Sequence, residues 1–428
     1  MTTLQDRPVG GTGTPGAGGT AAAPRLVLWS AEDAEHERWV RGRLFGSAEL
    51  AGRRTVVRIG PAGRGTVRAG VVTTPATAAR DIAGAPVVPP RPGGPRPVAL
   101  LFPGQGSQHP GMLTGLAAAD PRFRRDVDRV LDTWGEEGRA IRSDWLAARP
   151  RVELDDARRA QPLLFTLGVA LGAAVLRWGV EPAEVLGHSA GELVAAALTG
   201  VLAPEAAARM VRDRVAAAVD VPGGMLAVAA SVAELAPHLT GGVGVAAVNA
   251  ARQTMLAGPT DELAAVAAVL AGHDLVARAV PATTPFHSAA MEPAVERLLR
   301  DAEPPEPGTP WCTLVSGYTA APLRPEDARC PRFWARQLAD TVRFGPALDT
   351  LLARGDRMLL ETGPGQVLSA FARRHRAVRS GRSTVVSLAP GDVPDRRAVL
   401  EAALALWLEG HPIDPDGFPP VDHPREQR

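Results

Sequence analysis

The chain has 428 residues, 45% of them hydrophobic, and its 47 basic and 46 acidic residues give a formal net charge of +1. This length predicts two or three structural units, and the balanced charge argues against a general nucleic-acid or membrane-surface binder. Only two cysteines, Cys312 and Cys330, are present and all 47 basic residues are Arg, which argues against a disulfide framework, a metal site built on cysteines and lysine-dependent catalysis.

The first quarter of the chain predicts a leader followed by a small α/β unit. Residues 1–24 are rich in Gly, Thr and Pro and lack the basic and apolar regions of a signal peptide, so we expect a disordered leader. We find no run of about 18 uncharged apolar residues, so we expect no membrane span and a cytoplasmic protein. The α/β unit is predicted from strands at Arg25–Ser30, Arg54–Ile59 and Gly65–Val72, a helix over Ala31–Phe45 and a Pro-rich linker at Val87–Pro97.

The main body has the pattern of a parallel sheet with helices between its strands. It opens with Val98–Phe102, an unalternated apolar run typical of a buried parallel strand, which ends in a turn over residues 103–108. Strands that alternate with helices imply a mostly parallel sheet. The further strands are predicted at Glu184–Leu186, Cys312–Ser316 and Arg357–Glu361, and the helices at Gln161–Trp178, Ala190–Leu198, Arg332–Gln337 and Asp395–Glu409.

A second unit interrupts this pattern between residues 223 and 283. Its segments follow in the order strand, helix, strand, strand, helix, strand, which is the order of a ferredoxin-like fold. We therefore expect a small subdomain inserted into the main body. The six segments lie at Met225–Ala230, Val232–Leu239, Val243–Asn249, Thr254–Ala257, Thr260–Ala271 and Val276–Val280.

The first chemical motif is Gly187-His188-Ser189-Ala190-Gly191, which fits the G-x-S-x-G pattern of a nucleophile elbow. In such an elbow a tight turn between a strand and a helix exposes the serine Oγ, and the glycines avoid clashes with the sheet or with an acyl group. The pattern recurs by chance in a chain with 45 Gly, but here an apolar strand precedes it and a helix follows. Ser189 is therefore the candidate nucleophile.

A serine nucleophile needs a general base, and nine histidines are available. His188 is adjacent to the serine, and neighbours on a tight elbow point apart, which makes it a poor geometric candidate. His287 lies where the chain leaves the inserted unit for the main body, a junction that can face a cleft between the two. Spacing alone leaves a surface or core role for His287 open.

Several motifs occur together and in order. They are FPGQGSQ at Phe102–Gln108, GHSAGE at Gly187–Glu192, Arg214 at 25 positions after Ser189, and TPFHS at Thr284–Ser288. The chain thereby resembles the malonyl-CoA:acyl-carrier-protein transacylase family, and closely the acyltransferase domain of modular type I polyketide synthases. Residues 25–97 resemble the linker that follows a ketosynthase, and residues 407–414 resemble the linker after an acyltransferase.

The resemblance implies a role for each matching residue. Ser189 is the nucleophile and His287 is the general base, which a main-chain carbonyl orients in place of an acidic residue. The best-matching position for that carbonyl is Gln337. Backbone N–H groups of Gln105 and Ala190 form the oxyanion hole.

Arg214 matches the carboxylate-binding position of the family. A planar guanidinium pairs bidentately with the free carboxylate of a malonyl-type substrate, and an acetyl group would leave that cation unpaired. A salt bridge to a neighbour such as Asp213 is the alternative that the sequence leaves open. The resemblance also implies positions near the acyl pocket or supporting it at His188, Gln161, Asn249, Thr284 and Phe286.

Two features bear on the size of the acyl group. Phe286, directly before His287, resembles the malonyl type, because its bulk occupies the space that an α-substituent needs. Thr284 and Pro285, however, match neither the malonyl nor the methylmalonyl pattern of the family. Ala190 is smaller than the residues common at its position, which leaves room for a group larger than malonyl.

The fold class implied is α/β, with an α/β-hydrolase-like large subdomain at residues 98–222 and 284–385 and a ferredoxin-like small subdomain at 223–283. A small α/β linker domain at 25–97 precedes them, and a linker-like helix and tail occupy 386–428. We expect an acyltransferase that takes a malonyl-type group from acyl-CoA and passes it to the phosphopantetheine thiol of an acyl carrier protein, without a metal or redox cofactor.

No ketosynthase or carrier-protein signature flanks these segments, so we expect action in trans on a polyketide assembly line. Three alternatives remain open at the level of sequence. The acyl group could be unusual or monocarboxylic, with a carrier protein or a product hydroxyl as acceptor. The chain could be a serine hydrolase, because several acids lie between Ser189 and His287. It could also be a non-catalytic docking module.

Overall fold

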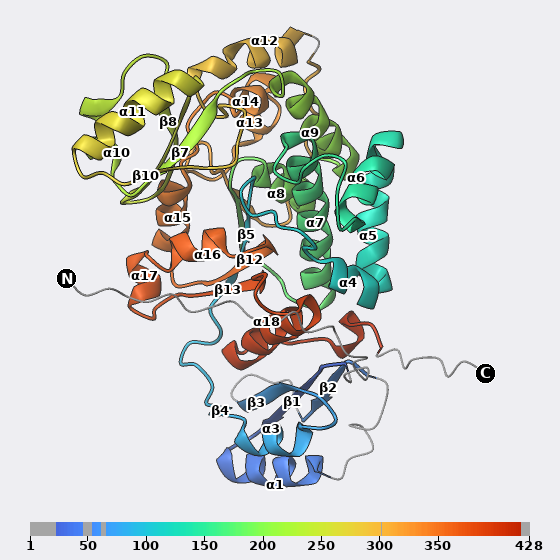
Figure 1. The fold of residues 1–428 in the computed structure, drawn as a ribbon. Coiled ribbons are helices and arrows are strands. Elements are labelled where there is room, and N and C mark those ends of the chain that lie inside the picture. The colour runs from blue at the N-terminus through green and yellow to red at the C-terminus, as the bar shows by residue number, and fades with distance from the viewer. Residues whose placement is uncertain (1–22, 46–53, 61–65, 301, 421–428) are drawn as a thin grey trace, which may run out of the picture.

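Three β-sheets organise the described part of the chain (Figure 1). The computed structural model describes residues 23–45, 54–60, 66–300 and 302–420, so most of the predicted leader lies outside the described residues. The strands are β1 (Arg25–Ala31), β2 (Val56–Ile59), β3 (Val67–Thr73), β4 (Val87–Val88), β5 (Val98–Phe102), β6 (Glu184–Gly187), β7 (Gly224–Val228), β8 (Gly244–Ala250), β9 (Gln253–Gly258), β10 (Ala277–Ala279), β11 (Thr313–Val315), β12 (Met358–Pro364) and β13 (Thr384–Ala389).

Helices cover these sheets and connect their strands. They are α1 (Ala34–Leu44), α3 (Ala78–Gly84), α4 (Thr114–Ala119), α5 (Pro121–Asp132), α6 (Glu136–Leu146), α7 (Ala157–Arg177), α8 (Gly191–Thr199), α9 (Pro204–Ala218), α10 (Val232–Leu235), α11 (Thr260–Gly272), α12 (Glu292–Arg300), α13 (Pro325–Ala328), α14 (Pro331–Arg336), α15 (Phe344–Ala353), α16 (Val367–Ala372), α17 (Arg376–Arg379) and α18 (Asp395–Glu409).

The large sheet has the order β11-β6-β5-β12-β13, and all its strand pairs are parallel. The two-sided burial of β5 explains why apolar and polar residues do not alternate along it. Leu100 and Phe102 lie in the core with α7 and α8, whereas Ala99 and Leu101 lie in a second core with α15 and α16. A parallel strand buried on both faces has no position left for a polar residue. The predicted parallel sheet is therefore confirmed.

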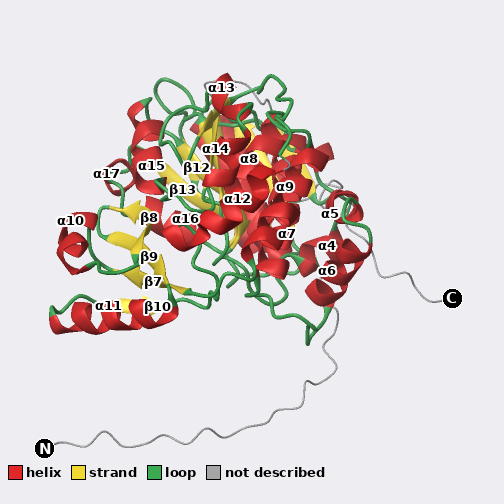
Figure 2. Cartoon of the chain, turned by 90° about the horizontal axis from the view of Figure 1, so that it is seen from above, coloured by secondary structure: helices red, strands yellow, loops and turns green. Residues whose placement is uncertain are grey.

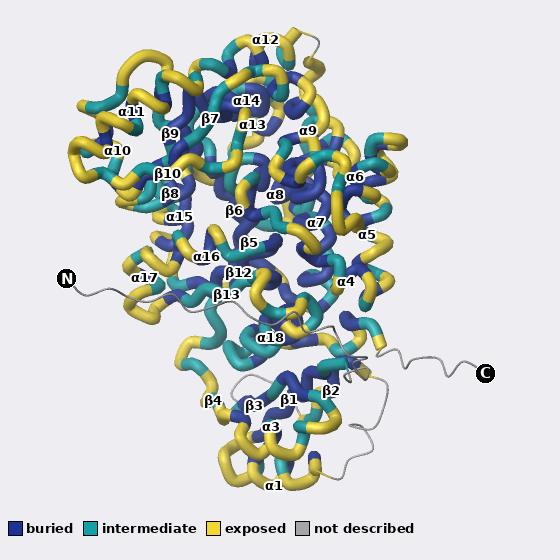
Figure 3. Tube along the Cα trace, viewed as in Figure 1, coloured by how far each residue is buried: buried dark blue, intermediate teal, exposed yellow. Residues whose placement is uncertain are grey.

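Helix α7 is the central helix of this core. It is long and apolar enough to cross a membrane by length and composition, but 83% of its most apolar window is buried inside the protein. Figure 3 shows α7 and α8 mostly buried, while α5 and α6, which pack against α7, have exposed outer faces. The helix therefore has the burial of a core element, although the sequence analysis found no apolar run of this length.

The small subdomain is a four-stranded antiparallel sheet in the order β10-β7-β9-β8. Numbered within the insert, this is the order 4-1-3-2 that a ferredoxin-like connectivity produces, so that prediction is confirmed. Its core gathers residues such as Leu226, Leu256 and Leu263 from the sheet and α11. The first helix is shorter than predicted, because the α-helical bonding of α10 passes into a 3₁₀ turn over residues 236–238, which contains Pro237.

One boundary differs from the sequence prediction. The large subdomain was expected to end at residue 385, but β13 runs from Thr384 to Ala389 and pairs with β12 as the fifth strand of the large sheet. Its side chains are only partly buried over its first four residues, as suits an edge strand. The short strand β4 likewise lies inside the segment predicted as a Pro-rich linker.

The amino-terminal unit has the sheet order β2-β1-β3-β4, with α1 and α3 beside it and α18 against its other side (Figure 1). Helix α18 also packs on β13, so the carboxyl-terminal helix lies between the two sheets. The indole N–H of Trp407 donates to the carbonyl of Ala69 at 2.9 Å. A Cβ on Gly70 would lie 2.7 Å from Leu404 Cδ1, so the strand and the helix are in close contact.

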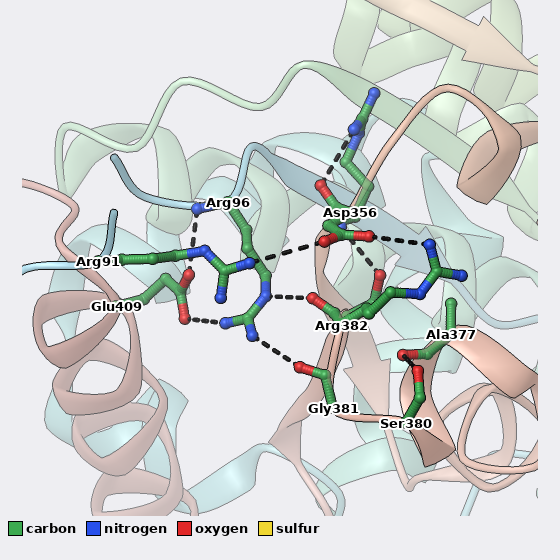
Figure 4. A network of polar contacts seen from close by, with 10 residues as sticks. Arg91, Arg96, Asp356, Ala377, Ser380, Gly381, Arg382 and Glu409 are labelled. Atoms are coloured by element: carbon green, nitrogen blue, oxygen red, sulfur yellow. Dashed lines mark hydrogen bonds and ion pairs between the residues drawn. The ribbon is translucent and has the colours of Figure 1, made fainter. Parts of the chain in front are cut away.

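A polar cluster next to α18 joins the same three parts of the chain (Figure 4). Arg96 precedes β5, and its guanidinium donates to Glu409 Oε2 at 2.6 Å and to the Gly381 carbonyl at 2.8 Å. Asp356, just before β12, pairs with Arg91 at 3.6 Å and Arg382 at 3.5 Å. The linker, the large sheet and α18 are therefore held together by ion pairs as well as by apolar packing.

Candidate active site

The nucleophile elbow forms as the sequence predicts. Ser189 lies between the end of β6 and the start of α8, and its φ of 52° is in the left-handed region. The flanking glycines have no room for a side chain. A Cβ on Gly187 would lie 2.3 Å from the backbone nitrogen of Glu192, and a Cβ on Gly191 would lie 2.1 Å from the carbonyl oxygen of Phe102. The turn is therefore sterically closed to larger residues on both sides of Ser189.

His287 is the histidine that meets Ser189. The Ser189 Oγ and His287 Nε2 are 2.7 Å apart. His287 is 6% exposed, also has a left-handed φ of 63°, and its backbone N–H donates to the Leu338 carbonyl at 2.7 Å. The choice among nine histidines that spacing left open is thus decided by geometry. His188, the neighbour of the serine, points instead to Asn249, as expected for adjacent residues on an elbow.

The opposite nitrogen of His287 faces main-chain carbonyls. Nδ1 lies 3.0 Å from the Asp340 carbonyl oxygen, which accepts its proton when Nε2 is free to act as a base. The sequence predicted the carbonyl of Gln337 for this position. That carbonyl also faces the ring, but with a smaller effect on the pKa of His287 than Asp340. The orienting position is therefore corrected to Asp340, with Gln337 as the weaker contact.

The carboxylate of Asp340 forms its hydrogen bonds with residues other than His287. It accepts hydrogen bonds from the Tyr318 hydroxyl at 2.5 Å and from Arg336, which also pairs with Glu292 at 3.0 Å. These contacts fix the turn that presents the Asp340 carbonyl. The main-chain carbonyl of Asp340 therefore orients the His287 ring, and the side-chain carboxylate of Asp340 does not.

His287 is held neutral by its surroundings. Burial, and next the positive charge of Arg214, lower its pKa from 6.5 to about 3. A neutral imidazole with a free Nε2 can accept the serine proton at any pH above that value. The two carbonyl contacts favour one orientation of the ring, and the low pKa favours its neutral state.

We expect acylation of Ser189 to keep its rate as the pH falls from about 7 to about 5, because His287 stays deprotonated well below the ordinary histidine pKa. The unfolded chain takes up this proton below pH 6.5 and the folded chain does not, so the stability of the fold should fall over the same range. Rapid-quench mass spectrometry of the acyl-enzyme measures the rate, and a loss centred near pH 6.5 in the folded protein would contradict the assignment.

The turn after β5 lies against the elbow. A Cβ on Gly104 would be 2.5 Å from the His188 carbonyl oxygen, so this glycine allows the two backbones to touch. Gln105 follows directly, and its side chain is held by the Asp155 carbonyl at 3.1 Å and by Gln161, whose Nε2 donates to Gln105 Oε1 at 3.2 Å. Gln161 therefore supports the loop that carries Gln105.

The backbone N–H groups of Gln105 and Ala190 have no hydrogen-bond acceptor among the described residues. Both belong to segments that meet at Ser189, one from the turn after β5 and one from the start of α8. Free N–H donors at such a point can stabilise the negative oxygen of a tetrahedral intermediate. The arrangement fits the oxyanion hole that the resemblance implied.

Arg214 is a buried cation that forms no direct ion pair in the described part of the chain, although the charge of Glu192 acts on it. It lies on α9 and is 3% exposed; its Nη1 is 3.5 Å from Gln337 Oε1, and its Nε has no partner. Burial lowers its pKa to about 10. The competing interpretation is removed, because Asp213 pairs with Arg212 on the surface of the helix. Arg214 thus has guanidinium donors available for an incoming carboxylate.

Glu192 is a residue of the site that the sequence interpretation missed. It lies in the first turn of α8, is 1% exposed, and lines a small cavity together with Ser189 and His287. Burial raises its pKa to about 7, against the opposing effects of Ser316, two backbone N–H groups and Arg214. Glu192 is the last residue of the GHSAGE motif. The motif could have identified it as a site residue, because the first turn of the helix after the elbow lies next to the nucleophile.

The remaining predicted positions surround this centre. His188 Nε2 is 2.8 Å from Asn249 Oδ1, and burial lowers the pKa of His188. Asn249 lies at the end of β8, whose neighbour Val248 donates to the Val342 carbonyl at 2.8 Å. This bond joins the small subdomain to the segment that orients His287. His188 and Asn249 therefore lie across the seam between the subdomains.

Thr284 and Phe286 are both buried, at 3% and 6% exposed. Phe286 packs in a cluster that includes Val215 and Ala218 of α9, the helix that carries Arg214. The Phe286 ring therefore packs against α9 on one side. Its centroid lies 6.4 Å from the centroid of the His287 ring. Ser189, His287 and Arg214 are therefore brought together as the resemblance implied, whereas the contact of Thr284 and Phe286 with an acyl group stays a prediction.

Comparison with known proteins gives the same result over most of the chain. Residues 99–413 match the acyl transferase domain family. A phenolphthiocerol synthesis polyketide synthase type I, Pks15/1 of Mycobacterium marinum, is 34% identical over 407 residues, which cover 91% of this chain and 19% of that protein. Polyketide synthase GfsA of Streptomyces halstedii is 33% identical over 329 residues, covering 74% of this chain and 4% of that protein. The chain spans less than a quarter of the length of either relative.

Solved structures agree with this match. The acyltransferase domain from the second module of the salinomycin polyketide synthase is 29% identical, with a TM-score of 0.72 over 92% of this chain and 85% of that chain. The acyltransferase domain of SpnD in complex with 2-(pent-4-yn-1-yl)malonyl is 27% identical, with a TM-score of 0.75 over 91% and 97%. MCAT from Streptococcus pneumoniae is 26% identical, with a TM-score of 0.61 over 72% and 99%. Because the family match covers well over half of the sequence and the motifs inside it meet at one site, the chain belongs to the acyl transferase domain family.

Proposed function

We propose that this acyltransferase moves a malonyl-type acyl group from CoA, through an ester on Ser189, to the phosphopantetheine thiol of an acyl carrier protein. The observation that carries the proposal is Arg214, a buried guanidinium with free donors on the helix that packs against Phe286. A buried cation is costly unless a carboxylate meets it. An acyl group with a free carboxylate supplies that partner, whereas an acetyl group does not.

In the first half-reaction, Nε2 of His287 accepts the Ser189 hydroxyl proton while Oγ attacks the thioester carbonyl carbon. The N–H groups of Gln105 and Ala190 donate to the resulting oxyanion. The carbon–sulfur bond then breaks, and the proton on His287 passes to the CoA sulfur. The products are free CoA and an acyl ester on Ser189.

The second half-reaction runs the same groups in the opposite sense. His287 accepts the proton of the phosphopantetheine thiol, whose sulfur attacks the ester carbonyl carbon. The ester bond to Ser189 breaks, and Oγ regains the proton from His287. No metal or redox group takes part in these steps, because every proton and electron pair is transferred between substrate and side chain.

The contacts of His287 favour transfer over the hydrolase alternative. Serine hydrolases of the elbow type usually orient their histidine with a carboxylate, which stabilises the charged imidazolium. Here Nδ1 faces the Asp340 carbonyl, and the carboxylate of that residue is bound by Tyr318 and Arg336.

The size of the acyl group is a separate question. The Phe286 ring next to His287 favours malonyl over larger groups. The structure of the SpnD acyltransferase domain contains a substituted malonyl group, so a protein of similar fold binds a larger group.

A panel of acyl-CoAs tests this proposal. The purified protein is mixed with malonyl-, methylmalonyl-, ethylmalonyl-, acetyl- and propionyl-CoA, and the mass added to Ser189 is followed by mass spectrometry. We expect dicarboxylic groups to load and monocarboxylic groups not to load. A holo carrier protein supplied as a separate chain then tests both the acceptor and the predicted action in trans. Loading of only monocarboxylic groups, or ester breakdown in water as fast as with the thiol, would contradict the proposal.

A further inference from the structure

Gln337 has a buried side-chain amide whose two ends differ in their contacts. The residue follows α14 as its C-cap and is 3% exposed. Its Oε1 lies 3.5 Å from Nη1 of Arg214, while its Nε2 has no hydrogen-bond partner among the described residues. The opposite orientation of the amide would set its N–H groups against those of the guanidinium, so chemistry favours the orientation observed. The Nε2 group is therefore a buried donor with no acceptor in the described fold.

Gln337 Nε2 is one of three buried polar atoms at this site that have no partner in the described part of the chain. The other two are Glu192 Oε1 and Arg214 Nε. Gln337 lines the same small cavity as Ser189, Glu192 and His287. An unpaired buried polar group is costly, so the gathering of these atoms at one cavity points to a ligand with complementary polar atoms.

The turn that carries Gln337 is held beside both His287 and Arg214. Leu338 is buried, and its carbonyl accepts the backbone N–H of His287 at 2.7 Å. Leu338 also belongs to the same apolar cluster as Val215 of α9, the helix of Arg214. Helix α12 packs against both α14 and α9, and the three helices lie side by side in Figure 2. Packing therefore fixes the backbone from which the Gln337 side chain reaches Arg214.

A carboxylate can accept more hydrogen bonds than one guanidinium supplies. Its two oxygens offer about four acceptor sites, and a bidentate contact with arginine fills two of them. The other sites lose their water when the acyl group enters a closed cavity, which is costly unless further donors meet them. Gln337 Nε2 is such a donor, and it belongs to the side chain that Arg214 already contacts.

We propose that the side-chain amide of Gln337 donates a hydrogen bond to the free carboxylate of the acyl group, in addition to those from Arg214. The proposal rests on the proposed function and names a specificity-determining residue of that same site. Gln337 Oε1 accepts from the guanidinium while Nε2 donates to the substrate, so one amide contacts both the cation and the anion. A neutral acyl group such as acetyl would leave Nε2 without an acceptor, which adds to the preference for dicarboxylic groups.

Substitutions of Gln337 test the amide alone, because the backbone carbonyl that faces His287 remains in every variant. Gln337→Met has nearly the same size as the wild-type side chain but no N–H donor. We expect kcat/KM for loading Ser189 from malonyl-CoA to fall about tenfold or more, as for a lost hydrogen bond to a charged group. Loading from acetyl-CoA should stay within about threefold of wild type. Mass spectrometry of the intact protein follows acylation with each thioester.

Gln337→Glu changes the charge at nearly the same size. A carboxylate at this position would pair with Arg214 and occupy the guanidinium that the substrate needs. We expect malonyl loading to fall further than in Gln337→Met, and acetyl loading to equal or exceed that of wild type. Thermal unfolding of both variants shows whether the fold is retained.

A double variant separates direct contact with the substrate from the positioning of Arg214. Because Nε2 donates to the carboxylate itself, Gln337→Met should lower malonyl loading again in the Arg214→Ala background, where no guanidinium remains to be positioned. An unchanged rate in that background would assign the amide to the positioning of Arg214 and overturn the contact with the substrate.

Gln253→Met is the matched control. Gln253 also accepts a hydrogen bond from an arginine, Arg374 at 3.0 Å, but it does not line the cavity, so this variant should load both thioesters like wild type. Equal losses of malonyl and acetyl loading in Gln337→Met would assign the amide to the structure of the site, and unchanged malonyl loading would mean that water satisfies Nε2. Either result overturns the proposal and leaves the proposed function intact. No malonyl loading by wild type would instead remove the proposed function, and the role of Gln337 with it.

Discussion

Ser189→Ala is expected to abolish the acyl-enzyme and to lower acyl transfer to a carrier protein by about 10⁴-fold or more. Without Oγ there is no ester to form, and His287 has no proton to accept at 2.7 Å. The thioester could then be broken only by direct attack of the acceptor or of water. Intact-protein mass spectrometry after incubation with malonyl-CoA measures the loss, because the wild-type adduct has the mass of the acyl group.

A matched serine controls for unspecific effects. Ser380 is exposed at the end of α17, and its hydroxyl donates to the Ala377 carbonyl, so Ser380→Ala should acylate like wild type. Unfolding curves of both variants show whether the fold is retained. A malonyl adduct that persists in Ser189→Ala would place the nucleophile on another residue and would refute the elbow assignment.

Arg214→Ala is expected to reduce malonyl loading selectively. Removing one partner of a buried charged contact costs about 2–5 kcal/mol, which corresponds to roughly a 30- to 5,000-fold loss in kcat/KM for malonyl-CoA. Acetyl loading should stay equal or rise, because the acetyl group makes no contact that needs the guanidinium. Arg214→Lys keeps the charge but loses the planar fork, so its malonyl loading should lie between those of Arg214→Ala and wild type. Acylation rates with the two thioesters give the ratio directly.

The neighbouring Arg212→Ala is the control on the same helix, since its guanidinium is exposed and pairs with Asp213. Arg212→Ala should leave the rates of loading from malonyl-CoA and from acetyl-CoA unchanged. The pH profile adds a second readout. Arg214 lowers the pKa of His287, so its removal should raise that pKa and move the acidic limb of the profile upward. An equal loss of malonyl and acetyl loading in Arg214→Ala would mean that the arginine supports the site without reading the carboxylate.

The local parts of the site could be predicted from the sequence because short-range sterics determine them. An apolar strand, two glycines around Ser189 and a following helix are enough to define the elbow, and the close contacts of Gly187 and Gly191 show why. The unbroken apolar run Val98–Phe102 likewise predicted a strand. Both faces of that strand are buried, so no polar residue alternates with the apolar ones. The insert was predictable in its order of segments, and the pairing of its strands follows from that order.

Other features depend on contacts that no local pattern records. His287 could be chosen from nine histidines only through the family motif, because its partner lies 98 positions away in the chain. The carbonyl that orients it belongs to a turn, and side chains do not reveal whether Gln337 or Asp340 directs its oxygen to the ring. Glu192 and Arg214 interact electrostatically from two different helices, α8 and α9. This interaction depends on how the helices pack, so the sequence does not reveal it.

The position of α18 has a consequence for transplanting this acyltransferase domain into a polyketide synthase. The helix lies within the family match, yet one of its faces is completed by the amino-terminal sheet, where Trp407 is fully buried and donates to Ala69. A fragment that begins at β5 would expose that indole together with its neighbour Leu404, and would remove Arg96, which donates to Glu409. Exposed apolar surface of this kind promotes aggregation. The portable unit is therefore the catalytic body together with residues 25–97, and swaps designed at the start of the catalytic motifs would divide a single packed structure.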